Sequence, residues 1–301
     1  MAIPGTGLPV ISRKTLNPAG FNMNINSNTE LYGIFGMPVR HSLSPVLHNA
    51  AFLQAGINAV YLAFEPGTIK EALDSMRTLK IMGASITIPF KVDAIELLDE
   101  IDPVSEKIGS VNTIKNLNGI LRGYNTDGAG AVKAIEDLGI GTEGSKVLII
   151  GNGGSARAVA FTLLDSGSKL VIAGRNPERV EALAGDLKRH GNHVDTALLS
   201  DIDGGFMKDV DIVINTTSVG MSPDSDNTPI DCGLISARNT VFDIVYNPHE
   251  TRLIRESMAK GCRVIHGIDM LINQAARQFE IWMGMKAPAG IYRETAYRHI
   301  F

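Results

Sequence analysis

The stretch Lys146-Val147-Leu148-Ile149-Ile150-Gly151-Asn152-Gly153-Gly154-Ser155-Ala156-Arg157 decides the fold of this chain. A strand-like apolar run enters a glycine-rich turn, and an apolar, helix-like stretch continues to Leu164. In such a unit the first glycine permits the tight turn, the second lets the backbone approach a pyrophosphate, and a small third residue lets the helix pack close to the strand. The helix N-terminus then faces the phosphates. The alternative is an ordinary flexible loop between a strand and a helix. We therefore predict a dinucleotide-binding turn, assigned to Gly151, Asn152, Gly153, Gly154, Ser155 and Ala156.

Around this turn, short strand-like runs alternate with helical stretches, a pattern typical of parallel sheets covered by helices. The predicted strands are 31–35, 60–64, 85–88, 147–150, 170–173, 212–215, 241–246 and 263–266. We predict an α/β fold with an N-terminal mixed α/β domain over 29–125 and a Rossmann-type, doubly wound dinucleotide-binding domain over 126–267. A cleft is expected between the two domains. Residues 1–28 are predicted to form a flexible polar tail.

Capping signals place two helices in the first half of the chain. One is predicted to start at Ser44 as its N-cap, with Pro45 in the first turn and Gly56 as the stop. A second is predicted from Asp127 to about residue 138. Between them, Asn118-Gly119 predicts a two-residue hairpin turn.

The composition narrows the class of ligand. Of 301 residues, 44% are apolar and 20% charged, which suffices to bury large cores. A net charge of −4 gives no basic footprint for nucleic acid or an anionic membrane, so a small-molecule ligand is expected. The two cysteines, Cys232 and Cys262, form no C-x-x-C pattern, which favours a reducing compartment. Since we find no secretory signal and no apolar run long enough to span a bilayer, we predict a soluble, cytoplasmic protein without membrane or nucleic-acid partners.

The end of the second nucleotide strand favours NADP over NAD. NAD enzymes commonly place an acid there to bind the ribose hydroxyls, whereas this chain offers Arg175 and Arg179, whose guanidinium forks suit a 2′-phosphate. The alternative is that both arginines are solvated at a helix start, with Glu178 paired to one of them. Further on, Asn215-Thr216-Thr217-Ser218-Val219-Gly220-Met221 follows a strand and is expected to line the ribose or nicotinamide, or else to form only a capped turn.

Polar side chains gather at strand ends in the N-terminal half. Lys91 follows the run 83–90, and the candidate partners are Ser42, Ser44, Thr87, Asn112 and Asp127. Such a set is expected for a polyhydroxylated ligand, and Asp127 could pair with the lysine. Each residue taken singly has a structural alternative: a helix cap for Ser44 and Asp127, a turn bond for Asn112, and a β-branched strand position for Thr87.

Taken together, these motifs resemble the shikimate dehydrogenase family over residues 30–285. The resemblance rests on Ser42-Leu43-Ser44-Pro45, Thr87-Ile88-Pro89-Phe90-Lys91, Val111-Asn112-Thr113, Gly123-Tyr124-Asn125-Thr126-Asp127-Gly128, Gly151-Asn152-Gly153-Gly154, the 215–221 loop, Asp243-Ile244-Val245-Tyr246-Asn247-Pro248 and residues 267–274. It implies NADP-dependent, reversible reduction of 3-dehydroshikimate to shikimate in chorismate biosynthesis. It also implies that residues 268–301 return to complete the first domain.

The resemblance assigns roles residue by residue. Lys91 and Asp127 become the catalytic pair, with the lysine ammonium donating a proton to the ketone oxygen as hydride arrives from NADPH. Ser42 and Ser44 should hold the substrate carboxylate, and Thr87, Asn112 and Gln274 should contact the carboxylate or ring hydroxyls. Tyr246 should border both substrate and nicotinamide, with Met270 near the nicotinamide. The remaining expected cofactor contacts are Thr216, Ser218, Met221, Ile244 and Gly267.

Two departures from the family pattern keep alternatives open. Ser85 stands where members acting on shikimate commonly have Asn, which could admit quinate. Gly174-Arg175-Asn176 replaces the usual Asn-Arg-Thr, which loosens the preference for NADP. The rivals are a quinate/shikimate dehydrogenase, a non-catalytic ligand-sensing homologue, and, by architecture alone, a methylenetetrahydrofolate dehydrogenase-like enzyme. We predict no metal, since the spacings of His41, His48 and His249 match no usual zinc pattern, and we expect a monomer or homodimer.

Overall fold

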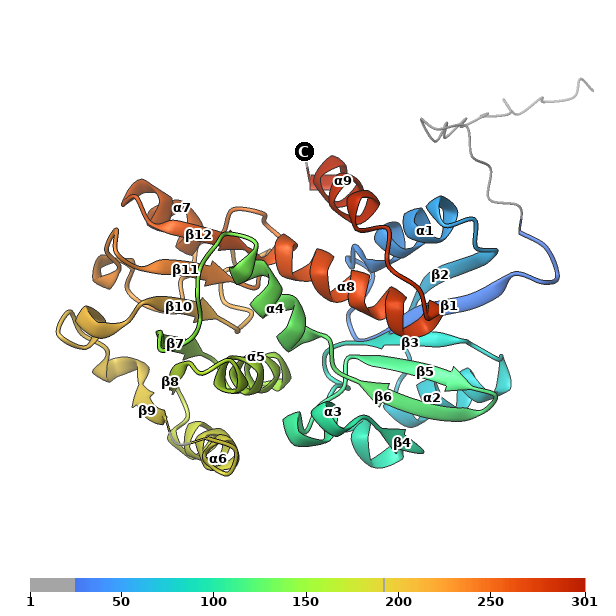
Figure 1. Cartoon of the computed structure of the whole chain (residues 1–301), viewed down its shortest axis with the longest axis horizontal. Coiled ribbons are helices and arrows are strands. Elements are labelled where there is room, and N and C mark those ends of the chain that lie inside the picture. The colour runs from blue at the N-terminus through green and yellow to red at the C-terminus, as the bar shows by residue number, and fades with distance from the viewer. Residues whose placement is uncertain (1–24, 192, 301) are drawn as a thin grey trace, which may run out of the picture.

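The computed structural model describes residues 25–191 and 193–300, which form two sheets side by side (Figure 1). Most of the predicted tail lies outside the described residues, and the part from 25 to 28 is exposed. None of the helices in the described ranges is both long and apolar enough to cross a membrane.

The first sheet, called the mixed sheet below, has the strand order β2-β1-β3-β5-β6-β4. Its strands are β1 (Glu30–Phe35), β2 (Ala59–Phe64), β3 (Gly83–Ile86), β4 (Glu100–Ile101), β5 (Thr113–Leu117) and β6 (Ile120–Tyr124). β1 pairs in parallel with β2 and β3, whereas β5 runs antiparallel to both β3 and β6. The prediction of a strand over 85–88 was wrong in its bounds, because Phe90 N–H bonds Thr87 O at 2.9 Å and turns the chain away.

The hairpin between β5 and β6 is confirmed. Asn118 and Gly119 have φ values of 56° and 99°, the left-handed pair that a type I′ turn requires. The Asn116 carboxamide oxygen accepts the Gly119 N–H at 2.7 Å and closes the turn.

The second sheet, called the parallel sheet, has the order β12-β11-β10-β7-β8-β9, with every pair parallel. Its strands are β7 (Lys146–Ile150), β8 (Lys169–Gly174), β9 (Val194–Leu198), β10 (Ile212–Asn215), β11 (Thr240–Asp243) and β12 (Arg263–His266). Counted from β7 in chain order, this is the doubly wound 3-2-1-4-5-6 arrangement, whose direction reverses between β7 and β10. The predicted fold class is confirmed.

Two strands of the parallel sheet depart from the prediction. β11 ends at Asp243 rather than at 246, because the Asp243 carboxylate accepts Val245 N–H at 3.0 Å and bends the chain. β9 was missed, since as an edge strand only its first residue, Val194, is buried and it lacks a continuous apolar run.

Helices cover both sheets. Within the described residues they are α1 (Ser44–Gln54), α2 (Ile69–Thr78), α3 (Pro103–Ile108), α4 (Asp127–Glu136), α5 (Gly154–Asp165), α6 (Pro177–Lys188), α7 (Arg252–Ala259), α8 (Gly267–Met283) and α9 (Ala289–Ile300), with 3-10 turns at Ile95–Leu97, Leu199–Asp201, Phe206–Asp209 and Cys232–Leu234.

The predicted cap of α1 was wrong. Ser44 is the first helical residue and Leu43 is the N-cap, whose apolar side chain cannot cap. The Ser42 hydroxyl, two residues before the predicted cap, instead accepts the Ser44 N–H at 3.2 Å. α4 ends at Glu136, two residues before the predicted end, although Gly139, with a φ of 66°, still closes the turn that follows.

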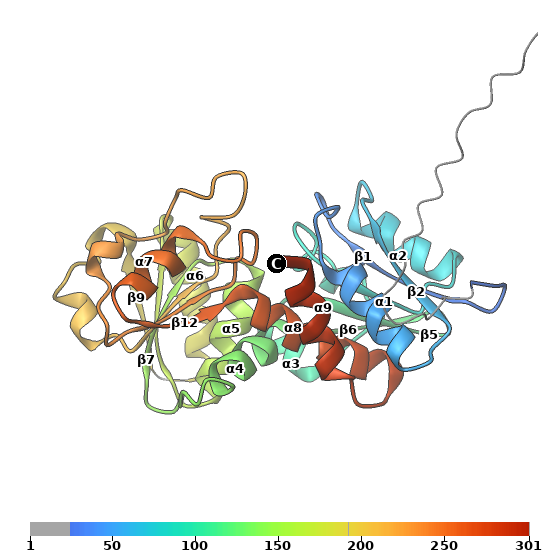
Figure 2. The ribbon, with the colours of Figure 1, turned by 90° about the horizontal axis from the view of Figure 1, so that it is seen from above.

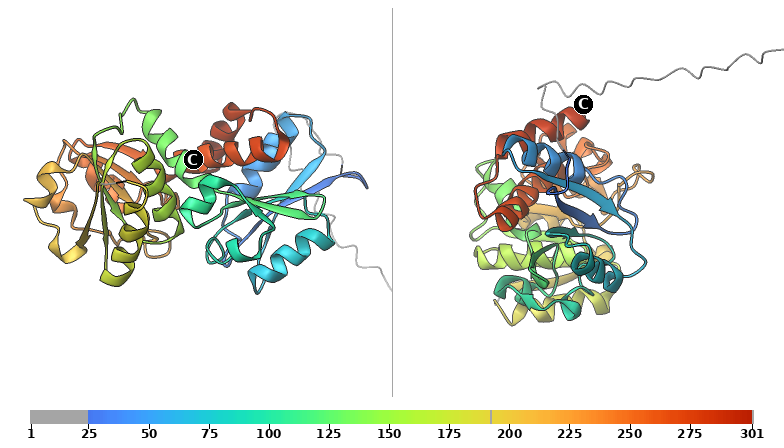
Figure 3. Two further views of the ribbon diagram at one scale, coloured as in Figure 1. Left: turned by 60° about the horizontal axis from the view of Figure 1, so that its bottom comes forward. Right: turned by 90° about the vertical axis from the view of Figure 1, so that its right-hand side faces the viewer.

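The two C-terminal helices lie with the mixed sheet although they follow the parallel sheet in sequence: α8 packs against β5 and α1, and α9 packs against α1 and α8 (Figure 3). One apolar core contains residues of β1, α1, α8 and α9, including Phe52, Phe279 and Tyr292. α4 and α8 run side by side between the two sheets (Figures 1 and 2). Their close approach requires Gly130, where a Cβ atom would lie 2.9 Å from Cβ of Gln274. This helix pair therefore joins the two halves and brings their polar loops together.

Candidate active site

Lys91 and Asp127 form an ion pair where the two halves meet. Lys91 lies in the turn after β3, and Asp127 is the first residue of α4. The lysine Nζ is 2.5 Å from Oδ2 of Asp127, and the two side chains are only 15% and 5% exposed. Such a charge-assisted hydrogen bond in a largely dry setting holds an ammonium in one place, where it could give up a proton.

Asn112 holds the other oxygen of the Asp127 carboxylate. This residue precedes β5, is 2% exposed, and places its Nδ2 2.6 Å from Asp127 Oδ1. The same Nδ2 lies 3.0 Å from Oε1 of Gln274 on α8. Three residues predicted separately along the sequence, Asn112, Asp127 and Gln274, thus form one hydrogen-bonded group next to Lys91.

Ser155 connects this group to the glycine-rich turn. Its hydroxyl, in the first turn of α5, lies 3.3 Å from Lys91 Nζ and 3.5 Å from Asp127 Oδ2. The predicted contact of Ser155 with the cofactor stays a prediction. Its side chain faces the lysine, so the helix expected to face the phosphates also contacts the ion pair.

A second polar group lies at the start of α1. Ser42 and Ser44 lie two residues apart there, and the side chain of Tyr246, after β11, interacts with the Ser42 side chain and the Leu43 backbone. Burial raises the pKa of Tyr246, and these two interactions oppose the rise. Tyr246 therefore carries a contact from the parallel sheet to the predicted carboxylate-binding serines. Thr87, half-buried after β3, has no hydrogen bond to its hydroxyl within the described residues.

Sequence reasoning missed Tyr61 of β2. Its hydroxyl lies 2.6 Å from Oγ of Ser85 and also interacts with Ser44, and burial raises its pKa. Ser85 is 4% exposed, and its own hydroxyl donates to Gln278 Oε1 at 2.9 Å. The Ser85 hydroxyl, on which the quinate alternative depends, is therefore already hydrogen-bonded to other side chains of the protein. A tyrosine within an apolar strand was the available signal, since its hydroxyl needs a partner when it is buried.

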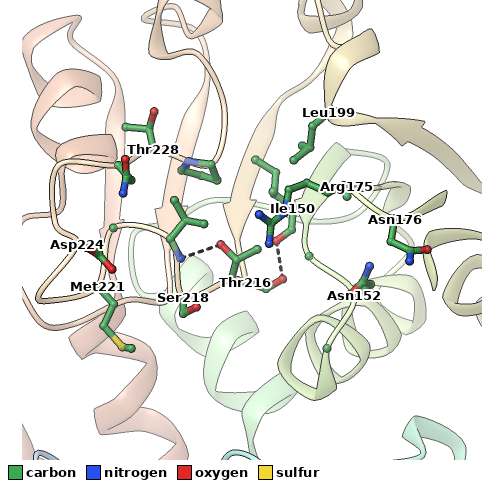
Figure 4. A pocket seen from close by; sticks show the side chains of 18 of the residues that line it. Ile150, Asn152, Arg175, Asn176, Leu199, Thr216, Ser218, Met221, Asp224 and Thr228 are labelled. Carbon is green, nitrogen blue, oxygen red and sulfur yellow. Dashed lines mark hydrogen bonds between the residues drawn. The ribbon is translucent and has the colours of Figure 1, made fainter. Parts of the chain in front are cut away.

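The predicted cofactor turn opens onto a pocket of about 760 Å³ at the carboxyl ends of β7, β8 and β10 (Figure 4). Asn152, Arg175 and Asn176 lie toward one end of it, and Ser218 and Met221 toward the other (Figure 4). The predicted cofactor residues in its wall are Gly151, Asn152, Gly153, Arg175, Arg179, Thr216, Ser218 and Met221. The pocket sits where the strand order reverses, the usual ligand position in an open parallel sheet.

Gly151 shapes the floor of this pocket. Its φ is +126°, and a Cβ atom there would lie 2.4 Å from Thr216 Oγ1. The Thr216 hydroxyl donates to Ile150 O at 2.7 Å, which ties the loop after β10 to the end of β7 (Figure 4). Gly153 is the N-cap of α5 and lines the pocket, so the N-terminus of that helix, which favours an anion, begins at the pocket wall.

The two arginines of the pocket are free of acidic partners. Among the described residues neither Arg175 nor Arg179 forms an ion pair, so the alternative pairing with Glu178 is not formed. The Asn176 side chain caps α6 by accepting Arg179 N–H at 3.0 Å, which orients the start of the helix. Both guanidinium groups remain available to a phosphate.

The other predicted cofactor residues do not line the pocket. Gly154 faces Lys91, Ala156 is buried in the core, and Gly267 packs against the carbonyl of Ile244, where a Cβ atom would lie 2.4 Å away. Met270, 6% exposed, packs in the core of the parallel sheet. Their assignments stay predictions.

The loop after β10 is held by a buried acid that sequence analysis did not single out. Asp243 accepts from Asn215 Nδ2 at 2.9 Å and from Thr251 at 2.6 Å, and Asn215 in turn accepts the Thr217 hydroxyl at 2.7 Å. Burial raises the pKa of Asp243 to about 6, against the opposing hydrogen bonds. An acid directly after the apolar pair Val241-Phe242 of a strand was the signal. No three His, Cys, Asp or Glu side chains in residues 25–191 and 193–300 group closely enough to hold a metal ion.

Comparisons with known protein families agree along most of the chain. Residues 34–114 match the shikimate dehydrogenase substrate binding domain, residues 133–222 match the shikimate / quinate 5-dehydrogenase family, and residues 267–297 match the shikimate 5′-dehydrogenase C-terminal domain.

Individual relatives match over nearly their full length. A protein of Moorella thermoacetica named shikimate dehydrogenase (NADP(+)) is 43% identical, over 89% of this chain and 93% of its own. The crystal structure of a shikimate dehydrogenase in complex with NADP+ matches at 39% identity and a TM-score of 0.87, covering 92% of this chain and 98% of that one. The Thermus thermophilus enzyme in complex with NADP(H) and shikimate matches at 31% identity and a TM-score of 0.81, covering 90% and 99%. The chain whose Lys91 and Asp127 meet beside a dinucleotide-type pocket thus belongs to the shikimate dehydrogenase family.

Proposed function

We propose that this protein is an NADP-dependent oxidoreductase that reversibly reduces 3-dehydroshikimate to shikimate in chorismate biosynthesis. The observation that carries the proposal is the Lys91–Asp127 pair, 2.5 Å apart and hydrogen-bonded to Ser155 at the start of the nucleotide helix. A proton donor next to a dinucleotide pocket is what carbonyl reduction needs. The names of the relatives and the bound molecules of the matched structures support the same activity.

Lys91 would serve as the general acid of the reduction. When bound, the nicotinamide supplies the hydride, and the carbonyl oxygen gains negative charge. The Lys91 ammonium lies within reach of a ligand beside Asp127, where it would stabilise this charge and transfer its proton to the oxygen. In the oxidative direction the neutral amine would take the hydroxyl proton. Asp127, fixed by Asn112, would keep the ammonium in position.

The pocket residues fit NADP in particular. The glycine turn and the N-terminus of α5 suit the pyrophosphate, and the unpaired Arg175 and Arg179 suit a 2′-phosphate. The other residues assigned to the cofactor would contact it only if it extends from this pocket toward Lys91. They are Gly154, Ser155, Ala156, Ile244, Gly267 and Met270.

The polar groups around Lys91 would hold the substrate. We assign the carboxylate to Ser42 and Ser44, with Tyr246 beside them, and the ring hydroxyls to Thr87, Asn112 and Gln274. Support comes from the contacts of Tyr246 with Ser42 and of Asn112 with Gln274, which bring together residues that lie far apart in sequence.

We also propose that residues 29–125 with 268–301 form the substrate domain and that residues 126–267 form the NADP-binding domain. The sharing of one apolar core by α1, α8 and α9 supports this division. We propose that the enzyme works in the cytoplasm, without nucleic acid, as a monomer or homodimer. Cys232 and Cys262 are both free thiols, as expected in a reducing compartment.

Initial rates with shikimate or quinate against NADP or NAD would test the proposal. We expect turnover with shikimate and NADP to exceed each other combination. Faster turnover with quinate would favour the quinate dehydrogenase alternative. Binding of shikimate without any change at the nicotinamide absorbance band would instead favour a ligand-sensing protein and refute the proposed activity.

A further inference from the structure

The carboxamide of Asn112 can be placed in two ways that differ only by exchange of its oxygen and nitrogen. In the observed orientation Nδ2 faces the Asp127 carboxylate at 2.6 Å. Rotated by half a turn, the carboxamide oxygen would face that carboxylate and both would repel. Since Asp127 holds Lys91, the orientation of Asn112 matters for the whole site.

The inner end of the carboxamide contacts three groups. Its Oδ1 accepts the backbone N–H of Thr126 at 2.8 Å and the hydroxyl of Thr113 at 2.7 Å. The Thr126 hydroxyl lies 3.2 Å from Oδ1 and 3.0 Å from Nδ2, so it can bond either end and favours neither orientation. The backbone N–H can only donate, so it favours oxygen at this end. The Thr113 hydroxyl can either donate or accept, so its direction depends on its other neighbour.

That neighbour is Gln278 of α8. Its Nε2 lies 3.0 Å from the Thr113 hydroxyl oxygen and 3.2 Å from the backbone carbonyl oxygen of Asn112. A carbonyl oxygen can only accept, so the Gln278 nitrogen must face it. The Thr113 oxygen therefore receives an N–H from Gln278 and turns its own proton toward Asn112.

The contacts of the Gln278 carboxamide oxygen are consistent with this orientation. Its Oε1 accepts the Ser85 hydroxyl at 2.9 Å and lies 3.3 Å from Nε2 of His48. The Ser85 oxygen accepts from Tyr61 at 2.6 Å, so its proton is directed to Gln278. Gln278 is 1% exposed and Thr113 fully buried, so water does not compete for these bonds.

We propose that Gln278 and Thr113 are positioning residues, which act through Asn112 to keep its carboxamide nitrogen turned toward Asp127 and the bound substrate. The inference rests on the proposed function for its effect on turnover. Gln278 follows Gln274 by one helical turn: Gln274 faces the site directly, whereas Gln278 acts from the interior.

The test compares Thr113→Val, which keeps the shape and removes the hydroxyl, with Thr113→Ser, which restores it. Thr240→Val removes an equally buried hydroxyl from the parallel sheet and is the matched control. Loss of one buried hydrogen bond should lower kcat/KM for shikimate by about 3- to 10-fold in Thr113→Val, with the KM for NADP unchanged. Thr113→Ser and Thr240→Val should stay within about twofold of the unsubstituted enzyme.

A second variant tests Gln278 itself. Gln278→Glu places an oxygen against the Asn112 carbonyl, so that only its protonated form can donate there. Its kcat/KM relative to the unsubstituted enzyme should fall as pH rises and recover as pH is lowered. A purely structural glutamine would show no such pH profile, and a constant ratio across pH would overturn its role.

A spectroscopic measurement separates this inference from the proposed activity. The side-chain amide signals of Asn112 are identified in ¹⁵N-labelled protein by their absence in Asn112→Asp. We expect them to shift in Thr113→Val and to return in Thr113→Ser, whether or not the protein turns over shikimate. Unchanged amide signals in Thr113→Val would overturn the inference, whereas absent turnover in the unsubstituted protein would refute only the proposed function.

Discussion

Acid should destabilise the core around His48, a fully buried residue of α1. Its Nδ1 accepts from the Tyr292 hydroxyl at 2.9 Å, its Nε2 lies 3.3 Å from Gln278 Oε1, and its ring stacks on Tyr61 with centroids 4.6 Å apart. Both ring nitrogens are therefore used by the neutral ring. Burial lowers the pKa of His48 from 6.5 to about 3, against the opposing effect of the hydrogen bond that the ring donates to Gln278.

The magnitude follows from proton linkage. Because the pKa is depressed in the folded state, the unfolded chain binds the proton first, and the stabilisation is complete above pH 6.5 and lost as pH falls toward 3. Each pH unit in this window is worth about 1.4 kcal/mol, so the free energy of unfolding should fall by about 2 kcal/mol between pH 7 and pH 5.

Asp243 acts in the opposite direction and partly masks this loss. Its pKa is raised from 3.8 to about 6, so its contribution to stability is complete below pH 3.8 and is lost as pH rises through 6. The loss from His48 must therefore be measured as a difference between the unsubstituted protein and a His48 variant, in which the contribution of Asp243 cancels.

The assay is urea unfolding at pH 7, 6 and 5, followed by fluorescence of Trp282, the single tryptophan, whose ring centroid lies 5.0 Å from that of His48. His48→Gln and His48→Leu should differ in absolute stability but share one pH dependence: relative to each, the unsubstituted protein should lose about 2 kcal/mol from pH 7 to pH 5. If the difference in free energy of unfolding between the unsubstituted protein and the variants does not change from pH 7 to pH 5, then His48 is protonated in the folded protein as well. That result would refute the reasoning.

Further predictions concern the site and the glycine turn. Lys91→Ala should lower kcat by about 10²- to 10⁴-fold while leaving NADP affinity, measured by calorimetry, within about twofold; near-normal turnover would exclude the lysine as the acid. Arg175→Ala and Arg179→Ala should each raise the KM for NADP by about tenfold or more without changing the KM for NAD, because each removes a charged hydrogen-bond donor. Equal effects on both cofactors would argue against a 2′-phosphate contact. Gly151→Ala should destabilise the fold by about 1 to 3 kcal/mol in urea unfolding, since it forces a positive φ and a clash with Thr216; an unchanged midpoint would contradict this account.

Local chemistry made much of the fold readable in advance. Each of three features is indicated by residues only a few positions apart. They are the Asn118-Gly119 turn, the buried strand before Gly151 and the apolar strands of the parallel sheet. Strand ends were harder to predict, because β3 and β11 stop where a hydrogen bond between residues two or three positions apart bends a run that still has strand-like composition. Edge strand β9 lacked a signal, since half-exposed residues show no clear apolar pattern.

The site was predictable as a set of residue types and not as a geometry. Ser155 shows the difference: its position in a glycine turn indicates a phosphate neighbour, yet its hydroxyl faces Lys91. Ser85 shows it again, since a short polar residue indicated an altered substrate site but is occupied by Tyr61 and Gln278. Neither partner is near in sequence.

By itself, the sequence determined the local conformations, the dinucleotide turn and the residue types available for proton transfer, because backbone preference and side-chain chemistry act over a few residues. Only the tertiary structure decided which polar groups meet. The pairing of Lys91 with Asp127, and the bonds from Gln278 through Thr113 to Asn112, depend on α4 and α8 packing closely between the two sheets. Hydrogen bonds are short and directional, so they form only after that packing has set the positions of residues that lie far apart along the chain.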